Sequence, residues 1–263
     1  MLDFFDRTTL LIMISALALA VLCVLPETRQ ITPIWIIAAG LNVGDTLFHE
    51  LGHAGFAWLL GRPAIPMIFT LFGADQAAGL SISFGRSWYV QIAAFAILAY
   101  ACVWIRDNYS FLFIPAVIFS LAIVGLAFSD EKYHQVLIAY MGHGTSMLVG
   151  GFMLFRAWVY LDSRNQYERW LNALFGFFIT FYNIHFAYML AYDPFFREVY
   201  SEHVDFGISH NDFWAIAQLM HGWTVHKIAL FTIGYGVAVI LIACIAAPLL
   251  QDKFSSAPDG IDY

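Results

Sequence analysis

Long apolar runs separated by short polar stretches dominate this chain. A helix needs roughly 20 mostly apolar residues to cross a bilayer. Seven runs come close to that length or exceed it, and they lie near 8–25, 33–60, 87–105, 111–128, 133–160, 168–192 and 224–249. The pattern predicts an all-α integral membrane protein with about six to seven transmembrane helices.

Residues 62–86 interrupt this helical pattern. Pro63, Pro66 and several glycines disfavour helix there, and Ile-Phe-Thr-Leu at 68–71 and Leu-Ser-Ile-Ser at 80–83 are typical of strands. Irregular backbone at membrane depth is tolerated only where protein or water satisfies its polar groups. We therefore expect a small β-hairpin-like or re-entrant element packed beside the membrane helices, directly after the helix at 33–60.

Two other stretches are polar. Residues 193–212 carry most of the charge between the last two apolar runs, and we expect an extramembrane loop there. Asn211 or Asp212 is suited to cap a short helix from Ala215 to Met220. Residues 250–263 form a short acidic tail.

Composition supports a membrane environment. The chain is 61% hydrophobic and 12% charged, whereas a soluble domain is about a quarter charged. Lipid must therefore cover most of the apolar side chains, and we expect a single polytopic membrane domain over 1–263 whose first partner is the lipid bilayer. The net charge of -7 includes no basic run, which argues against nucleic acid as a partner.

One polar cluster interrupts the apolar run at 33–60. Residues 45–55 read Asp-Thr-Leu-Phe-His-Glu-Leu-Gly-His-Ala-Gly, so His49 and His53 lie one helical turn apart and share a face. Two imidazoles in that arrangement can bind one cation, with Glu50 beside it as a base, and Zn²⁺ suits such a site. The five-residue pattern also arises by chance, but ionisable groups inside apolar helices are costly and persist mostly where they function. Asp45, one turn earlier, is expected to orient the His49 ring.

These residues resemble the site-2 protease family of intramembrane zinc metallopeptidases and their bacterial relatives. The resemblance is carried by His49-Glu50-Leu51-Gly52-His53-Ala54, by Ala57 and Gly61, and by Ile-Phe-Thr-Leu-Phe-Gly at 68–73. It implies that His49 and His53 bind zinc and that Glu50 activates water to hydrolyse peptide bonds of transmembrane or membrane-adjacent proteins. It also implies a multi-pass location in a bacterial inner membrane, with the core of the fold at about 31–160.

The family's third ligand, an Asp in a Leu-Asp-Gly motif, has no counterpart here. Helix geometry offers another candidate, because the His49–His53 pair and His143 both lie about 14–15 Å from the same membrane face at 1.5 Å per residue. Gly142 and Gly144 flank His143 and allow a close helix approach. We therefore predict His143 as the third ligand, with Asp130, Asp193 and His185 as alternatives.

Other functions fit the same residues. A non-proteolytic membrane metalloenzyme, for example one acting on lipids, would use the same metal chemistry. A non-catalytic metal-binding membrane protein is the third possibility, although Glu50, which ligates nothing in the protease scheme, favours catalysis.

Overall fold

A computed structural model describes residues 7–70, 78–159, 165–202 and 211–255. Nine helices and two strands follow one another in these residues, in the order α1 (Arg7–Val24), α2 (Thr32–Leu59), β1 (Ala64–Thr70), β2 (Ala78–Ser83), α3 (Trp88–Asn108), α4 (Phe113–Ala127), α5 (Glu131–Val159), α6 (Gln166–Tyr192), α7 (Pro194–Glu202), α8 (Asp212–Leu219) and α9 (Val225–Ser255). Short 3₁₀ turns at Thr28–Gln30 and Ser110–Leu112 precede α2 and α4. The predicted helical class is confirmed.

Six of the described helices are long enough and apolar enough to span a membrane, as in a multi-pass membrane protein: α1, α3, α4 with its 3₁₀ turn, α5, α6 and α9. The sequence pattern predicts a seventh span at 33–60. A 28-residue helix does form there, but α2 is not among the six apolar helices. Its polar side chains, including buried Asn42, Asp45 and Glu50, reduce its hydropathy.

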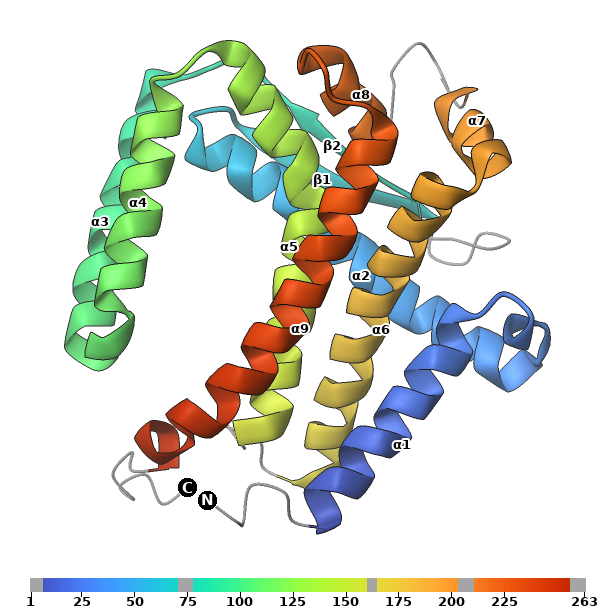
Figure 1. Cartoon of the computed structure of the whole chain (residues 1–263). Helices are drawn as coiled ribbons and strands as arrows, with labels where there is room; N and C mark the ends of the chain where they lie inside the picture. The colour runs from blue at the N-terminus through green and yellow to red at the C-terminus, as the bar shows by residue number, and fades with distance from the viewer. Residues whose placement is uncertain (1–6, 71–77, 160–164, 203–210, 256–263) are drawn as a thin grey trace.

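α5 occupies the centre of the bundle. It packs against α2, α6 and α9, while α1 covers the outer side of α6 (Figure 1). A buried apolar cluster joins α1, α5 and α6 around Ala16, Leu154 and Phe178. A second cluster joins α6, α8 and α9 around Leu190, Phe213 and Ile228. Together these clusters join α1, α6, α8 and α9 to the bundle.

The broken region after α2 forms a two-stranded antiparallel sheet, as predicted. Ala64 pairs with Ser83 and Met67 with Leu80, and the register shifts between Ile68 and Thr70. Both strands pack on α2. The turn at 71–77 lies outside the described residues. In Figure 1 the sheet lies at the same end of the bundle as α7 and α8.

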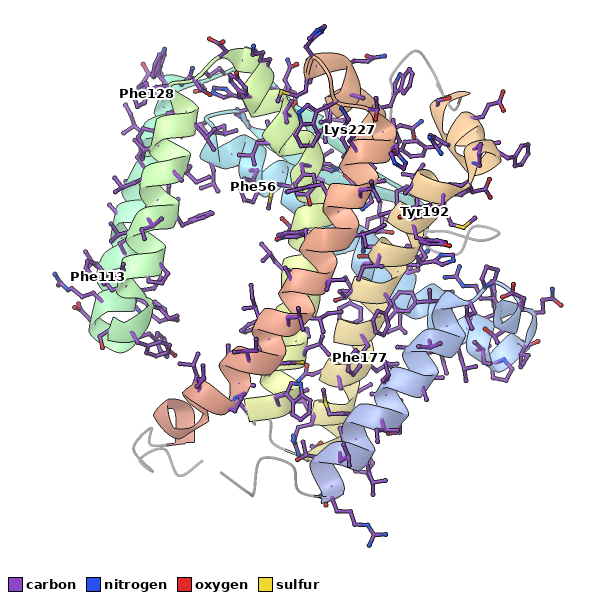
Figure 2. The ribbon with its side chains drawn as sticks, in the orientation of Figure 1. Phe56, Phe113, Phe128, Phe177, Tyr192 and Lys227 are labelled. Atoms are coloured by element: carbon purple, nitrogen blue, oxygen red, sulfur yellow. The ribbon has the colours of Figure 1, made fainter. Side chains whose placement is uncertain are left out.

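α3 and α4 form a hairpin that stands apart from the central bundle (Figure 1). Side chains project from the hairpin along its whole length, from Phe113 at one end of α4 to Phe128 at the other (Figure 2). Large apolar residues there are well exposed, among them Ile92, Ile114 and Leu121 at 64–68%. Such a surface requires an apolar solvent or partner.

The predicted loop at 193–212 is partly wrong. Nine residues of it, Pro194–Glu202, form α7, and α8 begins at Asp212 after Asn211 as N-cap. Backbone N–H groups of Phe195 and Phe196 donate to Oδ1 of Asp193, which starts α7. A short helix outside the apolar spans can be polar, so the polar composition of this stretch does not distinguish a helix from a loop. The tail from 256 onward lies outside the described residues.

Candidate metal centre

The His49-Glu50-x-x-His53 motif lies in the middle of α2, where its two imidazoles point the same way. Nε2 of His49 is 3.0 Å from Nε2 of His53. The side chains are only 19% and 11% exposed. The one-turn spacing therefore brings together the two imidazole nitrogens that the sequence predicts as ligands for a cation.

Helix α5 crosses α2 at this point and adds a third imidazole. The ring of His143 lies edge-on to that of His49, with centroids 4.5 Å apart. The close crossing depends on Gly52, because a Cβ there would come within 2.1 Å of the backbone oxygen of Met141. The structure thus places His143, which depth reasoning nominated, beside the two motif histidines.

A carboxylate that the sequence reasoning missed completes the cluster. Oδ2 of Asp212, the first residue of α8, is 3.0 Å from Nε2 of His49 and 3.2 Å from Nε2 of His53. It is 3.9 Å from Nε2 of His143. The sequence predicts Asn211 or Asp212 as a helix cap, the usual role of such residues before a short apolar stretch, and Asn211 is the N-cap. The only sequence signal of Asp212 is an acidic residue at a helix start.

Electrostatics hold the Asp212 carboxyl in its charged form. Burial by itself raises the pKa of this group. The neighbouring imidazoles of His53 and His49 outweigh burial, so the pKa of Asp212 is lowered well below its ordinary value. Asp212 therefore faces the three imidazoles as an anion.

Two of the three imidazoles are oriented through their other ring nitrogen. Nδ1 of His53 is 2.7 Å from the backbone oxygen of Ile138, and Nδ1 of His143 is 2.7 Å from Oδ1 of Asn183. A carbonyl oxygen can only accept, so each Nδ1 carries a proton, and Nε2 is the ring nitrogen that faces the cluster.

Asp45 has a different role from the predicted one. It was expected to orient the His49 ring, but its Oδ1 accepts a hydrogen bond of 3.1 Å from Nδ2 of Asn183. Helix spacing placed Asp45 one turn before His49 and carried no information about Asn183, which lies on α6. Asp45 therefore acts on His143, through the amide of Asn183.

Glu50 is buried on the side of the cluster that faces the sheet. The hydroxyl of Ser81 on β2 donates to its Oε2 at 2.8 Å. A Cβ on Gly79 would come within 2.7 Å of Oε1, so only glycine fits there without a shift. A carboxylate oxygen of Glu50 and ring nitrogens of His49 and His53 all lie within 4.8 Å of one another. Glu50 is therefore near the ring nitrogens of His49 and His53, while the shortest contacts of these nitrogens are with each other and with Asp212.

The donor set fits a single small cation. Ligands at about 2.0–2.2 Å from a tetrahedral zinc are roughly 3.3 Å from one another. The two motif nitrogens are 3.0 Å apart, and Oδ2 of Asp212 lies 3.0–3.9 Å from the three imidazoles. A Cβ on Gly142 would lie 2.4 Å from Nε2 of His53 and 2.6 Å from Nε2 of His49. Glycine at 142 thus keeps the space in front of the nitrogens clear. Two groups of described residues could hold a metal ion, His49 with Glu50 and His53, and His49 with His143 and Asp212.

The alternative third ligands lie elsewhere in the described residues. Asp130 is exposed at the start of α5, and Asp193 caps α7 through its side chain. His185 is half-buried and lies near Arg29 and Glu27. None of the three belongs to a group of described residues that could hold a metal ion.

Comparisons of the chain with protein-family models, with the curated proteins and with the solved structures find no match.

Proposed function

We propose that this protein is a zinc-dependent hydrolase of the membrane, with peptide bonds as its substrate. The observation that carries the proposal is the position of the His143 ring beside the paired ring nitrogens of His49 and His53, with a carboxylate oxygen of Glu50 within 4.8 Å of that pair. Metal binding is supported by this geometry. Peptide hydrolysis is supported by the resemblance of the motif to the site-2 protease family.

His49, His53 and His143 would hold the metal through Nε2. Imidazole nitrogens suit zinc, although several other divalent ions accept them. Zinc at such a site supplies Lewis-acid chemistry, because it polarises a carbonyl and makes water a stronger acid. Asn183 and the carbonyl of Ile138 hold two of the rings in the tautomer that this binding needs.

Glu50 would move the proton. As a carboxylate it takes a proton from the attacking water, and as a carboxylic acid it passes that proton to the leaving amine. The hydroxyl of Ser81 holds Oε2 in place, and β2 lies against Glu50 along Gly79 and Ser81. An extended peptide could pair with an edge of this two-stranded sheet, which would bring its backbone close to Glu50.

The six apolar helices support a multi-pass position in a membrane, and the resemblance favours a bacterial inner membrane. Substrates would then be transmembrane or membrane-adjacent proteins.

Metal analysis and one substitution test the proposal. Purified protein should contain about one zinc per chain. Glu50→Gln should keep the zinc and abolish turnover, so proteomics of membrane fractions should show substrates that accumulate relative to wild type. Glu27→Gln, at an exposed site between α1 and α2, is the matched control and should leave both readouts unchanged. Metal-free protein, or unchanged substrate levels with Glu50→Gln, would contradict it.

One observation favours a second candidate, a non-catalytic metal-binding protein. With Asp212, the three imidazoles and one carboxylate oxygen would make four possible protein ligands for the metal. Structural zinc sites have four protein ligands, whereas catalytic sites keep one position open. In that case Glu50→Gln would keep the metal and change no membrane protein's abundance.

A further inference from the structure

The position of Asp212 is not explained by the hydrolase proposed above. One carboxylate oxygen contacts Nε2 of His49 and of His53 and lies 3.9 Å from Nε2 of His143. With three imidazoles and this oxygen, a zinc ion would have a complete tetrahedral set of protein ligands. Water or a substrate carbonyl would then find no open position.

The histidines are poor candidates for leaving the metal. All three lie in the interiors of long helices, and His53 and His143 are fixed at Nδ1. The His143 ring is also stacked on Phe186, with centroids 5.2 Å apart, and packs against Phe213 at 4.9 Å. Moving any of these rings would disturb a packed helix pair.

Asp212 is attached differently. It is the first residue of an eight-residue helix, and the contacts described for its carboxylate are those with the three imidazoles. The rest of α8 is held separately, because Phe213 and Ile216 are buried in the cluster with α6 and α9. The carboxylate can therefore leave the imidazoles while α8 stays anchored.

The other side of α8 has room to adjust. Trp214, Ala217 and Gln218 line an open cavity of about 900 Å³ between α7 and α9. A small rotation of α8 about Phe213 and Ile216 would be taken up by this space instead of by packed side chains.

We propose that Asp212 is an exchangeable fourth ligand, which closes the metal site in the resting protein and gives up its position to water or substrate. The inference rests on the proposed function, since it presupposes a bound metal. It assigns to α8 the opening and closing of the site.

Cobalt substitution tests this inference, because Co²⁺ accepts the ligands of zinc and its visible absorption reports the set of ligands bound. Purified full-length wild type and Asp212→Ala would each be loaded with Co²⁺, analysed for metal content and titrated with azide, a small anion that needs an open position. Asp212→Asn, which keeps the shape of the side chain, serves as the second variant if the alanine variant does not fold. Asp107→Ala, at an exposed ion pair with Arg106, is the matched control.

We expect both Asp212 variants to retain about one Co²⁺ per chain, with an altered spectrum, and to bind azide roughly tenfold more tightly than wild type or more. Loss of cobalt from both variants would show a permanent ligand, and equal azide affinity in all proteins would show that Asp212 is not a ligand. Either result overturns the inference and leaves the proposed function standing. A wild type that binds no metal would overturn the proposed function itself.

Discussion

Asn183 joins buried polar groups on two other helices. Its Oδ1 accepts from Nδ1 of His143 on α5, and its Nδ2 donates to Oδ1 of Asp45 on α2. The side chain is 2% exposed, so both bonds are made away from bulk solvent. One amide on α6 therefore fixes the ring orientation and tautomer of His143, the proposed metal ligand on a different helix.

Substitution of this amide should weaken metal binding. Asn183→Leu removes both hydrogen bonds, and we expect metal affinity to fall by about 10–100-fold. The free energy of unfolding should fall by about 1–3 kcal/mol, since Asp45 and His143 each lose a buried partner. Competition with a chelator of known affinity measures the first effect, and denaturation measures the second.

Asn172→Leu is the matched control for this change, because Asn172 lies on the same helix away from the cluster. We expect it to leave metal affinity unchanged. If both variants lost affinity equally, the effect would come from the helix rather than from positioning of His143.

The residues of the candidate site differ in how far the sequence could predict them. His49, Glu50 and His53 follow from one-turn spacing within a single helix. His143 followed from depth, because the helices at 33–60 and 133–160 meet the same face. Asp212 could not be predicted, since its approach depends on how α8 packs between α6 and α9. A helix cap and a metal ligand look alike in the sequence.

At the scale of elements, the sheet of β1 and β2 serves as a wall beside Glu50. Gly79 and Ser81 are two residues apart on β2 and therefore lie on the same face of the strand, which meets Glu50. The breakers and strand-like segments between 62 and 86 predicted this hairpin. The glycines of the stretch are predicted only to break helix, and the contact of Gly79 with Glu50 is not predicted because Glu50 lies on another element.

Ser81 on this strand should affect turnover and leave metal binding intact. Ser81→Ala removes the hydrogen bond to Oε2 of Glu50 while His53 and His143 keep their hydrogen bonds at Nδ1. We expect turnover to fall by about tenfold, since an untethered base is less often aligned with its proton. Cleavage of a substrate identified with Glu50→Gln provides the rate, and metal analysis of the same sample provides the occupancy.

Ser83→Ala, two residues further along β2 at an exposed position, is the control and should behave as wild type. A Ser81→Ala variant that lost its metal would instead give Ser81 a structural role.

At the scale of the whole molecule, the path of the chain bears on how many times it crosses the membrane. α1 rises part of the way through the bundle and α2 continues obliquely to the end that carries the sheet (Figure 1). α3, α4, α5, α6 and α9 then alternate in direction. The sequence pattern predicts about six to seven spans, and the seventh arises because length and apolar content are read separately for 8–25 and 33–60. In the fold, the two helices together make a single ascent.

This path predicts that the two ends of the described chain face the same side of the membrane. Six crossings are an even number, so Arg7 and Ser255 should lie together, whereas seven would separate them. Single cysteines at these two positions, in a background without Cys23, Cys102 and Cys244, should react alike with an impermeant maleimide in oriented vesicles. A cysteine at exposed Phe195 on α7 should show the opposite accessibility. Opposite labelling of the two ends would mean that α2 crosses on its own.

The space in front of Gly142 also has a consequence for relatives of this protein. Any larger residue there would collide with Nε2 of His49 and of His53, so selection for the metal would hold glycine at this position as firmly as it holds the histidines. A diverged relative should then carry His-Glu-x-x-His, a Gly-His pair on a later helix, an Asn on the next long helix and an Asp at the start of a short one. Such a signature, spread over four helices, would remain recognisable after the lipid-facing residues had been exchanged freely.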